Sequence, residues 1–516
     1  MARRICLYNL PVELLTVILD YLDFRDILNL SEDHDFPVGV VRREHIDNDM
    51  AGGNILHMIA RTGWTYIPQI RYFIQILDSW DIPHLHWNET PLGVAVKHGY
   101  YELCRFFIEA GAQVNPPRGI SPLFLAVRAF KSVDLVSLLI QSGADVSWTD
   151  SKGLPIIFHA ARCANTDSLD LLISSGADPK YFSERYGSLL HEARNPAVAR
   201  LLIKHGADVN RVSLGRSSPL MKAVEHGRSE VVDVLLDAGA AVDYCEFDGL
   251  TALTTAIVYK RLDIVRKLIS SGCEFNKTFE DELDPPLLLA AASGNEDIVR
   301  ILLENGVDVT ARNSEEETVL FHVTKRSSLS LVQELVAAGA DIEAKDKDGQ
   351  TPLIKAIYAQ DKKLVKLLLD AKADVSQLDR DGVHPTIALI AGTRSELRDI
   401  AQQFEDYGIY GLAEFKYFDH PDDDYSKMDT AMLQVLLDLG ADISEMNYKG
   451  IGILHYAVIR NNKDLVKFLL DAGADATYKD PGGNTPADWA SVMGYGKIAE
   501  LLRTAEVDRK KVYLAQ

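Results

Sequence analysis

Three features that define common protein classes are missing from this sequence. Its 516 residues include only five cysteines, which are odd in number, widely spaced and never arranged as Cys-x-x-Cys. A disulfide framework or a zinc site is therefore not expected, and reduced thiols in the cytoplasm and/or the nucleus fit this usage better. No stretch approaches the roughly 20 apolar residues that a membrane-spanning helix needs, and the start of the chain does not resemble a secretory signal. We therefore expect no membrane partner.

An excess of positive charge is also missing. The chain has 54 lysines and arginines against 75 aspartates and glutamates, which gives a formal net charge of −21 and a pI near 5.1. A long acidic chain repels phosphate backbones, so no nucleic-acid partner is expected. The sequence also has no Walker loop, no nucleophile elbow and no catalytic cysteine context. We predict that the chain is not an enzyme and that it uses no cofactor and no metal.

What the sequence does contain is a glycine that recurs after a leucine-rich stretch about every 33 residues. A glycine just past a helix can adopt the left-handed conformation that satisfies the last free carbonyls. In one unit Lys372 takes the place of this glycine, so we expect left-handed strain there. The series comprises Gly111, Gly143, Gly176, Gly206, Gly239, Gly272, Gly306, Gly339, Gly440 and Gly473.

Each unit has the local signals of two helices. In "DKDGQTPLIKAI", Asp-Gly is typical of a turn, Thr351 is a good helix N-cap and Pro352 suits the first helical position. Ala356 is small enough for neighbouring helices to approach closely. The stretch "LVKLLLD" that follows is apolar at helical spacing. The unit is therefore predicted to run turn, helix, short loop, helix and glycine stop.

These units resemble ankyrin repeats. "DGQTPLIKA", "GGNTPADWA" and "NETPLGVA" are similar to the family's turn and TPLH element, and "DIVRILLENGVDV" is similar to its second helix and exit. The resemblance covers residues 51–507 and implies an all-α solenoid of about 12–13 helix-turn-helix units, followed by a tail at 508–516. Stacked units share one continuous core and leave an open surface for a protein partner.

One repeat contains an insertion at about residues 393–430. The insertion is rich in aromatic residues and then acidic, from Asp422 to Asp424. It is either a partner-binding arm or regulated loop, with Tyr425 or Ser426 as phosphorylation candidates, or a loop that packs its aromatics on the solenoid. In a shorter repeat, Pro196 is expected to cap the second helix.

The histidines have a structural interpretation. His57, His191 and His455 occupy the TPLH position, where the resemblance implies a hydrogen bond between adjacent turns. "HEARN" lacks the second histidine of a zinc protease, and "GIGILH" lacks the third glycine and the βαβ setting of a dinucleotide loop. One group of side chains could ligate a metal, namely Asp81, His84, His86 and His98. Its three histidines have neither helical nor Cys-x-x-Cys spacing, which makes them a weak signal for a metal site. Histidines in surface loops are therefore the favoured interpretation.

The first 50 residues do not repeat. "LPVELLTVILDYLDFRDILNLS" resembles the first part of an F-box, which implies docking onto the Skp adaptor of a cullin–RING ubiquitin ligase. After Ser31 the resemblance ends, because Pro37 and Gly39 come early and no tryptophan occurs before Trp64. The competing interpretation of residues 5–50 is a cap and linker that shield the first repeat from water. The resemblance assigns the adaptor contact to Leu10, Pro11, Leu14, Leu15, Ile18 and Leu22.

The sequence therefore predicts a non-catalytic receptor that binds a protein target on the ankyrin surface and is tethered to a ubiquitin ligase through its leading segment. The alternative is an ankyrin scaffold with no ligase role. The tips of the turns are expected to contact the target, since exposed aromatic and arginine side chains are good anchors. The candidates are Trp148, Phe247, Arg380 and Tyr448.

Overall fold

The computed structural model describes residues 54–63, 67–77, 81, 83, 88–129, 132–163, 165–246, 249–276, 284–324, 326–391, 430–444, 446–447 and 450–515. The F-box-like segment and insertion residues 393–429 lie outside this set. The described residues form 26 helices, which follow one another as thirteen short antiparallel pairs. The predicted all-α solenoid of about 12–13 units is confirmed.

The chain divides into two compact units, residues 1–244 and 245–516, and each is described by itself. In the first unit, the first helices of the described pairs are α3 (Ile55–Thr62), α5 (Pro91–His98), α7 (Pro122–Arg128), α9 (Ile156–Arg162), α11 (Leu189–Glu192) and α13 (Pro219–Glu225). The second helices are α4 (Ile67–Ile76), α6 (Tyr101–Glu109), α8 (Val133–Gln141), α10 (Thr166–Ser174), α12 (Pro196–Lys204) and α14 (Ser229–Asp237). A two-residue ladder, β1 (Phe182–Ser183) against β2 (Gly187–Ser188), precedes α11.

The second unit repeats the same arrangement. Its first helices are α15 (Ala252–Val258), α17 (Pro286–Ser293), α19 (Val319–His322), α21 (Pro352–Tyr358), α23 (Pro385–Ala391), α26 (Ile453–Ile459) and α28 (Pro486–Val492). Its second helices are α16 (Leu262–Ser270), α18 (Glu296–Glu304), α20 (Leu329–Ala337), α22 (Lys362–Asp370), α25 (Thr430–Asp438), α27 (Lys463–Asp471) and α29 (Gly496–Ala515).

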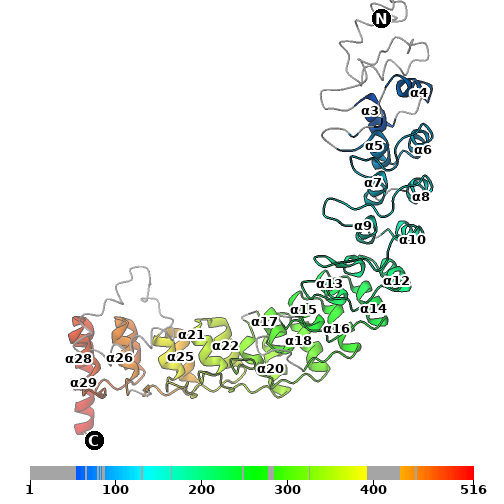
Figure 1. Cartoon of the computed structure of the whole chain (residues 1–516). Coiled ribbons are helices and arrows are strands. Elements are labelled where there is room, and N and C mark those ends of the chain that lie inside the picture. The colour runs from blue at the N-terminus through cyan, green and yellow to red at the C-terminus, as the bar shows by residue number, and fades with distance from the viewer. Residues whose placement is uncertain are drawn as a thin grey trace, which may run out of the picture. The chain divides into compact units, whose positions relative to one another are not determined.

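Within each unit the first helices stack on one another in chain order. In the first unit α3 contacts α5, α5 contacts α7, and the series continues through α9 and α11 to α13. In the second unit the same series runs from α15 through α17, α19, α21, α23 and α26 to α28. Figure 1 shows the repeated helix pairs of each unit. This stacking buries the apolar face that a single pair leaves open.

Local sequence signals fix where the helices begin and end. The Thr351 side chain accepts a hydrogen bond from the Ile354 amide, and Pro352 occupies the first turn of α21. Lys372 has a φ of 73°, so the expected left-handed backbone is present without glycine. The cap predicted at Pro196 is wrong, because Asn195 caps α12 by accepting from the Val198 amide at 2.8 Å, and proline only fills the first helical position.

The core of the second unit continues on both sides of the insertion. Helix α23 contacts both α25 and α26. Leu433 and Leu436 of α25 are fully buried in the same apolar cluster that contains Tyr456 and Trp489. The indole of Trp489 also donates a hydrogen bond to Asp480 at 2.9 Å. Buried side chains therefore join the last repeats into one continuous core.

Candidate functional site

The candidate site is the surface formed by the turn tips and the exposed ends of the first helices. Main-chain hydrogen bonds join consecutive tips in the second unit. The Lys347 amide donates to the Glu315 carbonyl at 3.0 Å, and the Arg380 amide donates to the Asp348 carbonyl at 3.1 Å. These bonds hold three successive tips in register, so side chains at the tips project from a continuous edge.

An aspartate inside the tip makes two of these turns rigid. The Asp346 carboxylate accepts from the amides of Asp348 and Gln350, at 3.0 and 2.9 Å. In the next repeat, Asp379 accepts from the Val383 amide at 2.8 Å. Asp346 and Asp379 are both buried. Because the carboxylate satisfies amides that the turn would leave unpaired, the tip keeps one shape without a ligand.

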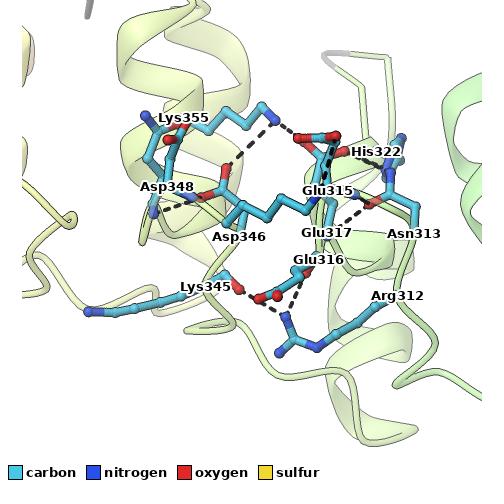
Figure 2. A network of polar contacts seen from close by, with 12 residues as sticks. Arg312, Asn313, Glu315, Glu316, Glu317, His322, Lys345, Asp346, Asp348 and Lys355 are labelled. Atoms are coloured by element: carbon cyan, nitrogen blue, oxygen red, sulfur yellow. Dashed lines mark hydrogen bonds and ion pairs between the residues drawn. The ribbon is translucent and has the colours of Figure 1, made fainter.

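A network of charged groups connects two of the repeats behind these tips (Figure 2). The Glu317 carboxylate, which is only 8% exposed, forms an ion pair with Lys355 of the following repeat. It also contacts His322 at 3.0 Å and accepts from the Asn313 amide group at 3.1 Å. Burial lowers the pKa of both Lys355 and His322. The network therefore ties one repeat to the next.

Beside the network lies an open cavity of about 380 Å³. Its walls include the carboxylates of Glu315, Glu317 and Asp346, together with Lys355 and Tyr358. Glu317 already binds Lys355, and Asp346 accepts main-chain amides and lies 3.8 Å from the same lysine. The charges that line this cavity thus hold the repeats together, and this is a structural role.

The four predicted target contacts have different outcomes. Trp148 is half-buried, with its ring 5.1 Å from that of Phe124. Arg380 is exposed, and its guanidinium donates to the Lys347 carbonyl at 3.5 Å. Phe247 and Tyr448 lie outside the described residues, as do the adaptor contacts predicted between Leu10 and Leu22. Since Trp148 and Arg380 belong to different units, each remains a separate prediction for its own surface.

The predicted role of the TPLH histidines is confirmed. The Nε2 atoms of His57, His191 and His455 lie 3.2, 2.9 and 3.3 Å from main-chain carbonyls of the following turn. All three rings are buried. Burial lowers the pKa of His191, and it lowers the pKa of His455 to about 4. The rings of His191 and His455 are therefore neutral at pH 7, and all three histidines join consecutive repeats.

No group of three or more histidine, cysteine or acidic side chains is placed to hold a metal in the part of the chain that the structure describes. His84 and His86 lie outside that part. His98 stacks on Tyr100 with ring centroids 5.9 Å apart, and Asp81 accepts from the Gln113 amide at 2.5 Å. Burial raises the pKa of Cys104 to about 12, which keeps this thiol protonated. None of the described helices is both long and apolar enough to span a bilayer.

Sequence reasoning missed a second joint between repeats, which we call the asparagine clamp. Asn115 accepts from the Asp145 amide and donates to the Gly143 carbonyl, each at 2.8 Å. Asn210 makes the same two contacts with Ala241 and Gly239, at 2.8 and 3.3 Å. A signal was present, because both asparagines stand four residues after an exit glycine.

Comparison with known proteins identifies the repeats. The family model described as "Ankyrin repeats (3 copies)" matches residues 123–213, 189–279, 286–379 and 425–511. A second model, described as "Ankyrin repeat", matches residues 87–117. Together these matches cover more than half of the chain.

Several curated proteins are similar over part of their length. Human transient receptor potential cation channel subfamily A member 1 is 25% identical over 314 residues, which are 50% of this chain and 27% of that protein. The B-cell lymphoma 3 protein homolog of Mus musculus is 31% identical over 229 residues, 41% of this chain and 50% of that one. Glycerophosphocholine phosphodiesterase gde1 of Schizosaccharomyces pombe is 27% identical over 43% of this chain and 18% of the enzyme. The chain thus spans half or less of the length of these relatives.

A solved structure is also similar. The crystal structure of the human ASB11 ankyrin repeat domain has 24% sequence identity and a TM-score of 0.39. The match covers 43% of this chain and 99% of that domain.

Proposed function

Because the chain belongs to the ankyrin-repeat family, we propose that it is a non-catalytic receptor whose tips and first helices bind a protein target. The observation that carries this proposal is the rigid edge of consecutive tips, joined by main-chain bonds such as that from Lys347 to Glu315. A surface that keeps its shape without a partner loses little entropy on binding. The specific residues decide the function, because the fold alone does not.

We further propose that the leading segment tethers this receptor to the Skp adaptor of a cullin–RING ubiquitin ligase. The support is the order of residues in "LPVELLTVILDYLDFRDILNLS", which places leucines and isoleucine at helical spacing after Leu-Pro. The mechanism would be proximity, since tethering raises the effective concentration of a bound target near the conjugating enzyme. The residues proposed to carry the contact are Leu10, Pro11, Leu14, Leu15, Ile18 and Leu22.

An affinity pull-down with purified Skp adaptor tests the tether. The full chain is compared with a variant that combines Leu14→Asp and Ile18→Asp, which puts two carboxylates at the proposed apolar contact. We expect the wild type to be retained and the variant to be lost, because an unpaired carboxylate is costly to bury at an interface.

The matched control combines Thr16→Asp and Asn29→Asp, which adds two carboxylates at polar positions of the same segment. This control should be retained like the wild type. If the wild type is not retained under conditions where a known F-box protein binds, the tether is rejected. The alternative, an ankyrin scaffold whose leading segment caps the first repeat, then stands.

The absence of catalysis is part of the proposal. One relative is named as a phosphodiesterase, but the match covers only 18% of that enzyme. The buried histidines and the protonated thiol of Cys104 have structural surroundings, which favours binding over chemistry at these positions.

A further inference from the structure

Four first helices of the first unit carry a basic residue at the same position, seven residues after the N-cap. The N-caps are Asn54, Thr90, Ser121 and Pro155. The corresponding side chains are Arg61, Lys97, Arg128 and Arg162, and all four are exposed. Helices α3, α5, α7 and α9 each contact the next one. The four side chains therefore form one line across adjacent repeats, which we call the basic row.

The row is only partly neutralised by nearby carboxylates. Lys97 lies 2.8 Å from Glu89, and Arg162 lies 3.8 Å from Glu192. The guanidinium of Arg128 lies over the Phe124 ring at 5.9 Å. Among the described residues, no carboxylate is within ion-pair distance of Arg128. An exposed arginine held on an aromatic face keeps its N–H groups available for an incoming anion.

A further arginine extends this positive region. Burial raises the pKa of Cys163, and the charges of Arg194, Arg128 and Arg162 act against that rise. The three arginines therefore lie close enough to this half-buried thiol for their charges to act on it. Arg194 is exposed, and no described carboxylate forms an ion pair with it. His159, which lies near Arg128 and Arg162, is hydrogen-bonded to Asp150 at 3.0 Å.

The fold does not require basic residues at this position. In the last two repeats of the first unit, the equivalent residues are Asn195 and Glu225, so the basic row ends before them. In the second unit, Lys325 holds the place after the Thr318 cap and lies outside the described residues. The other equivalent positions with a defined N-cap are apolar or aromatic, and they are Val258, Ala292, Tyr358, Ile459 and Val492.

We propose that the basic row binds an extended acidic segment of a partner protein, with one carboxylate for each repeat. Packed helices are separated by about 8–10 Å. A polyproline II segment rises about 3.1 Å per residue and has three residues per turn, so every third side chain lies on one face, about 9 Å apart. A segment with an acidic residue at every third position therefore matches the spacing of the row. Each contact is a charge-assisted hydrogen bond.

This inference rests on the proposed function, because it names the chemistry of the target. The net charge of the chain favours a protein partner over a nucleic acid, since a formal charge of −21 repels a continuous phosphate backbone. A short acidic segment contacts only the local positive field and has far fewer charges to bring near the rest of the chain.

The test is fluorescence anisotropy with the full chain and a labelled peptide of five Glu-Pro-Pro repeats. A second peptide of the same composition has its five glutamates in one block. We compare wild type with the double variant Arg128→Glu plus Arg162→Glu. The expected result is at least about tenfold weaker binding by the variant, and at least about threefold weaker binding of the block peptide by wild type. Binding of the first peptide should also weaken as salt rises.

The matched control combines Arg200→Glu and Lys204→Glu on α12, where both side chains are exposed and the change in net charge is the same. It should bind within about twofold of wild type. Equal loss in both double variants would reduce the effect to total charge and overturn the inference. Equal binding of both peptides would overturn the proposed match between the spacing of the glutamates and the spacing of the repeats. Tighter binding of a 15-nucleotide thymidine oligonucleotide than of the peptide would assign the row to nucleic acid.

The same preparations are used in the adaptor pull-down, after circular dichroism has shown equal helix content. If the wild type retains the adaptor but binds no peptide, this inference is rejected and the proposed tether stands. If the peptide binds but the adaptor is not retained, the tether alone is rejected.

Discussion

The two units use the same helix pair and place their charges differently. In the second unit, charged side chains join one repeat to the next. Arg300 binds Glu334 of the following repeat at 2.9 Å, and Lys355 pairs with buried Glu317. In the first unit, Arg162 lies 3.8 Å from Glu192 of the following repeat, which is a longer contact. Arg128 and Arg194 have no described carboxylate partner and remain exposed. Capping and packing positions therefore fix the repeat, while the remaining positions give each unit its own surface chemistry.

A tryptophan substitution in each unit tests whether the two units are also separate in stability, and it should have the greatest effect of the changes considered. Trp489 is fully buried in the second unit, so Trp489→Ala should lower the free energy of unfolding by about 3–5 kcal/mol. Trp148 in the first unit is half-buried, and Trp148→Ala should cost about half as much or less. Urea denaturation measures the loss, and hydrogen exchange locates it.

In a repeat protein, each unit contacts only its neighbours. Trp489→Ala should therefore reduce amide protection within residues 245–516 and leave protection in the first unit close to that of wild type. Equal loss of protection in both units would show that the chain unfolds as a single body, and the comparison would then apply to surface chemistry only.

The next largest effect is a pH dependence. The pKa of His455 falls from 6.5 to about 4 on burial, so the unfolded chain binds this proton more readily than the folded one. The resulting loss of folding stability is small above pH 6.5 and grows as the pH falls toward 4. It reaches on the order of 3 kcal/mol, since one pKa unit corresponds to about 1.4 kcal/mol. Urea midpoints measured between pH 7.5 and 4.5 check this slope.

The control for this slope is His455→Gln, which keeps a polar side chain and removes the titration. It should be less stable than wild type at pH 7, because the contact with the Asn484 carbonyl is weakened. Its stability should nevertheless fall less steeply with acid. A slope identical to that of wild type would show that other groups cause the acid sensitivity of the second unit.

The smallest effect tests the ion pairs between repeats. Lys355→Met removes the cation from the buried carboxylate of Glu317, and we expect the free energy of unfolding to fall by about 1–3 kcal/mol. Lys347→Met is the control, because Lys347 and Glu315 are 3.5 Å apart and both are more than half exposed. It should cost less than about 0.5 kcal/mol. Equal losses of stability for the two variants in thermal denaturation would show that the buried ion pair between repeats contributes no more than an exposed one.

The beginnings and ends of individual helices could be predicted from the sequence. Thr351, Pro352 and the exit glycines act on their own helix, so their roles follow from a few neighbouring residues. The histidine contacts followed from the family resemblance, which specifies where the next turn lies. Even the left-handed backbone of Lys372 was predictable, because the other positions of the series are glycine.

Contacts between repeats were harder to predict. Glu317 and Lys355 are 38 residues apart, and their pairing depends on how two helices and two turns are registered in space. The four-residue helices α11 and α19 also differ from the regular unit, in which the first helix has seven or eight residues. The basic row was visible in principle, but only after each N-cap was known and residues could be counted from it.

The asparagine clamp has a consequence for how such a chain can grow. Asn115 and Asn210 hold the following repeat through its amide and carbonyl groups, which every residue except proline supplies in full. A joint of this kind places few demands on the side chains of its neighbour. Whole repeats could therefore be duplicated, deleted or exchanged in the gene without compensating substitutions at the seam, while each new copy remains free to acquire a different exposed face.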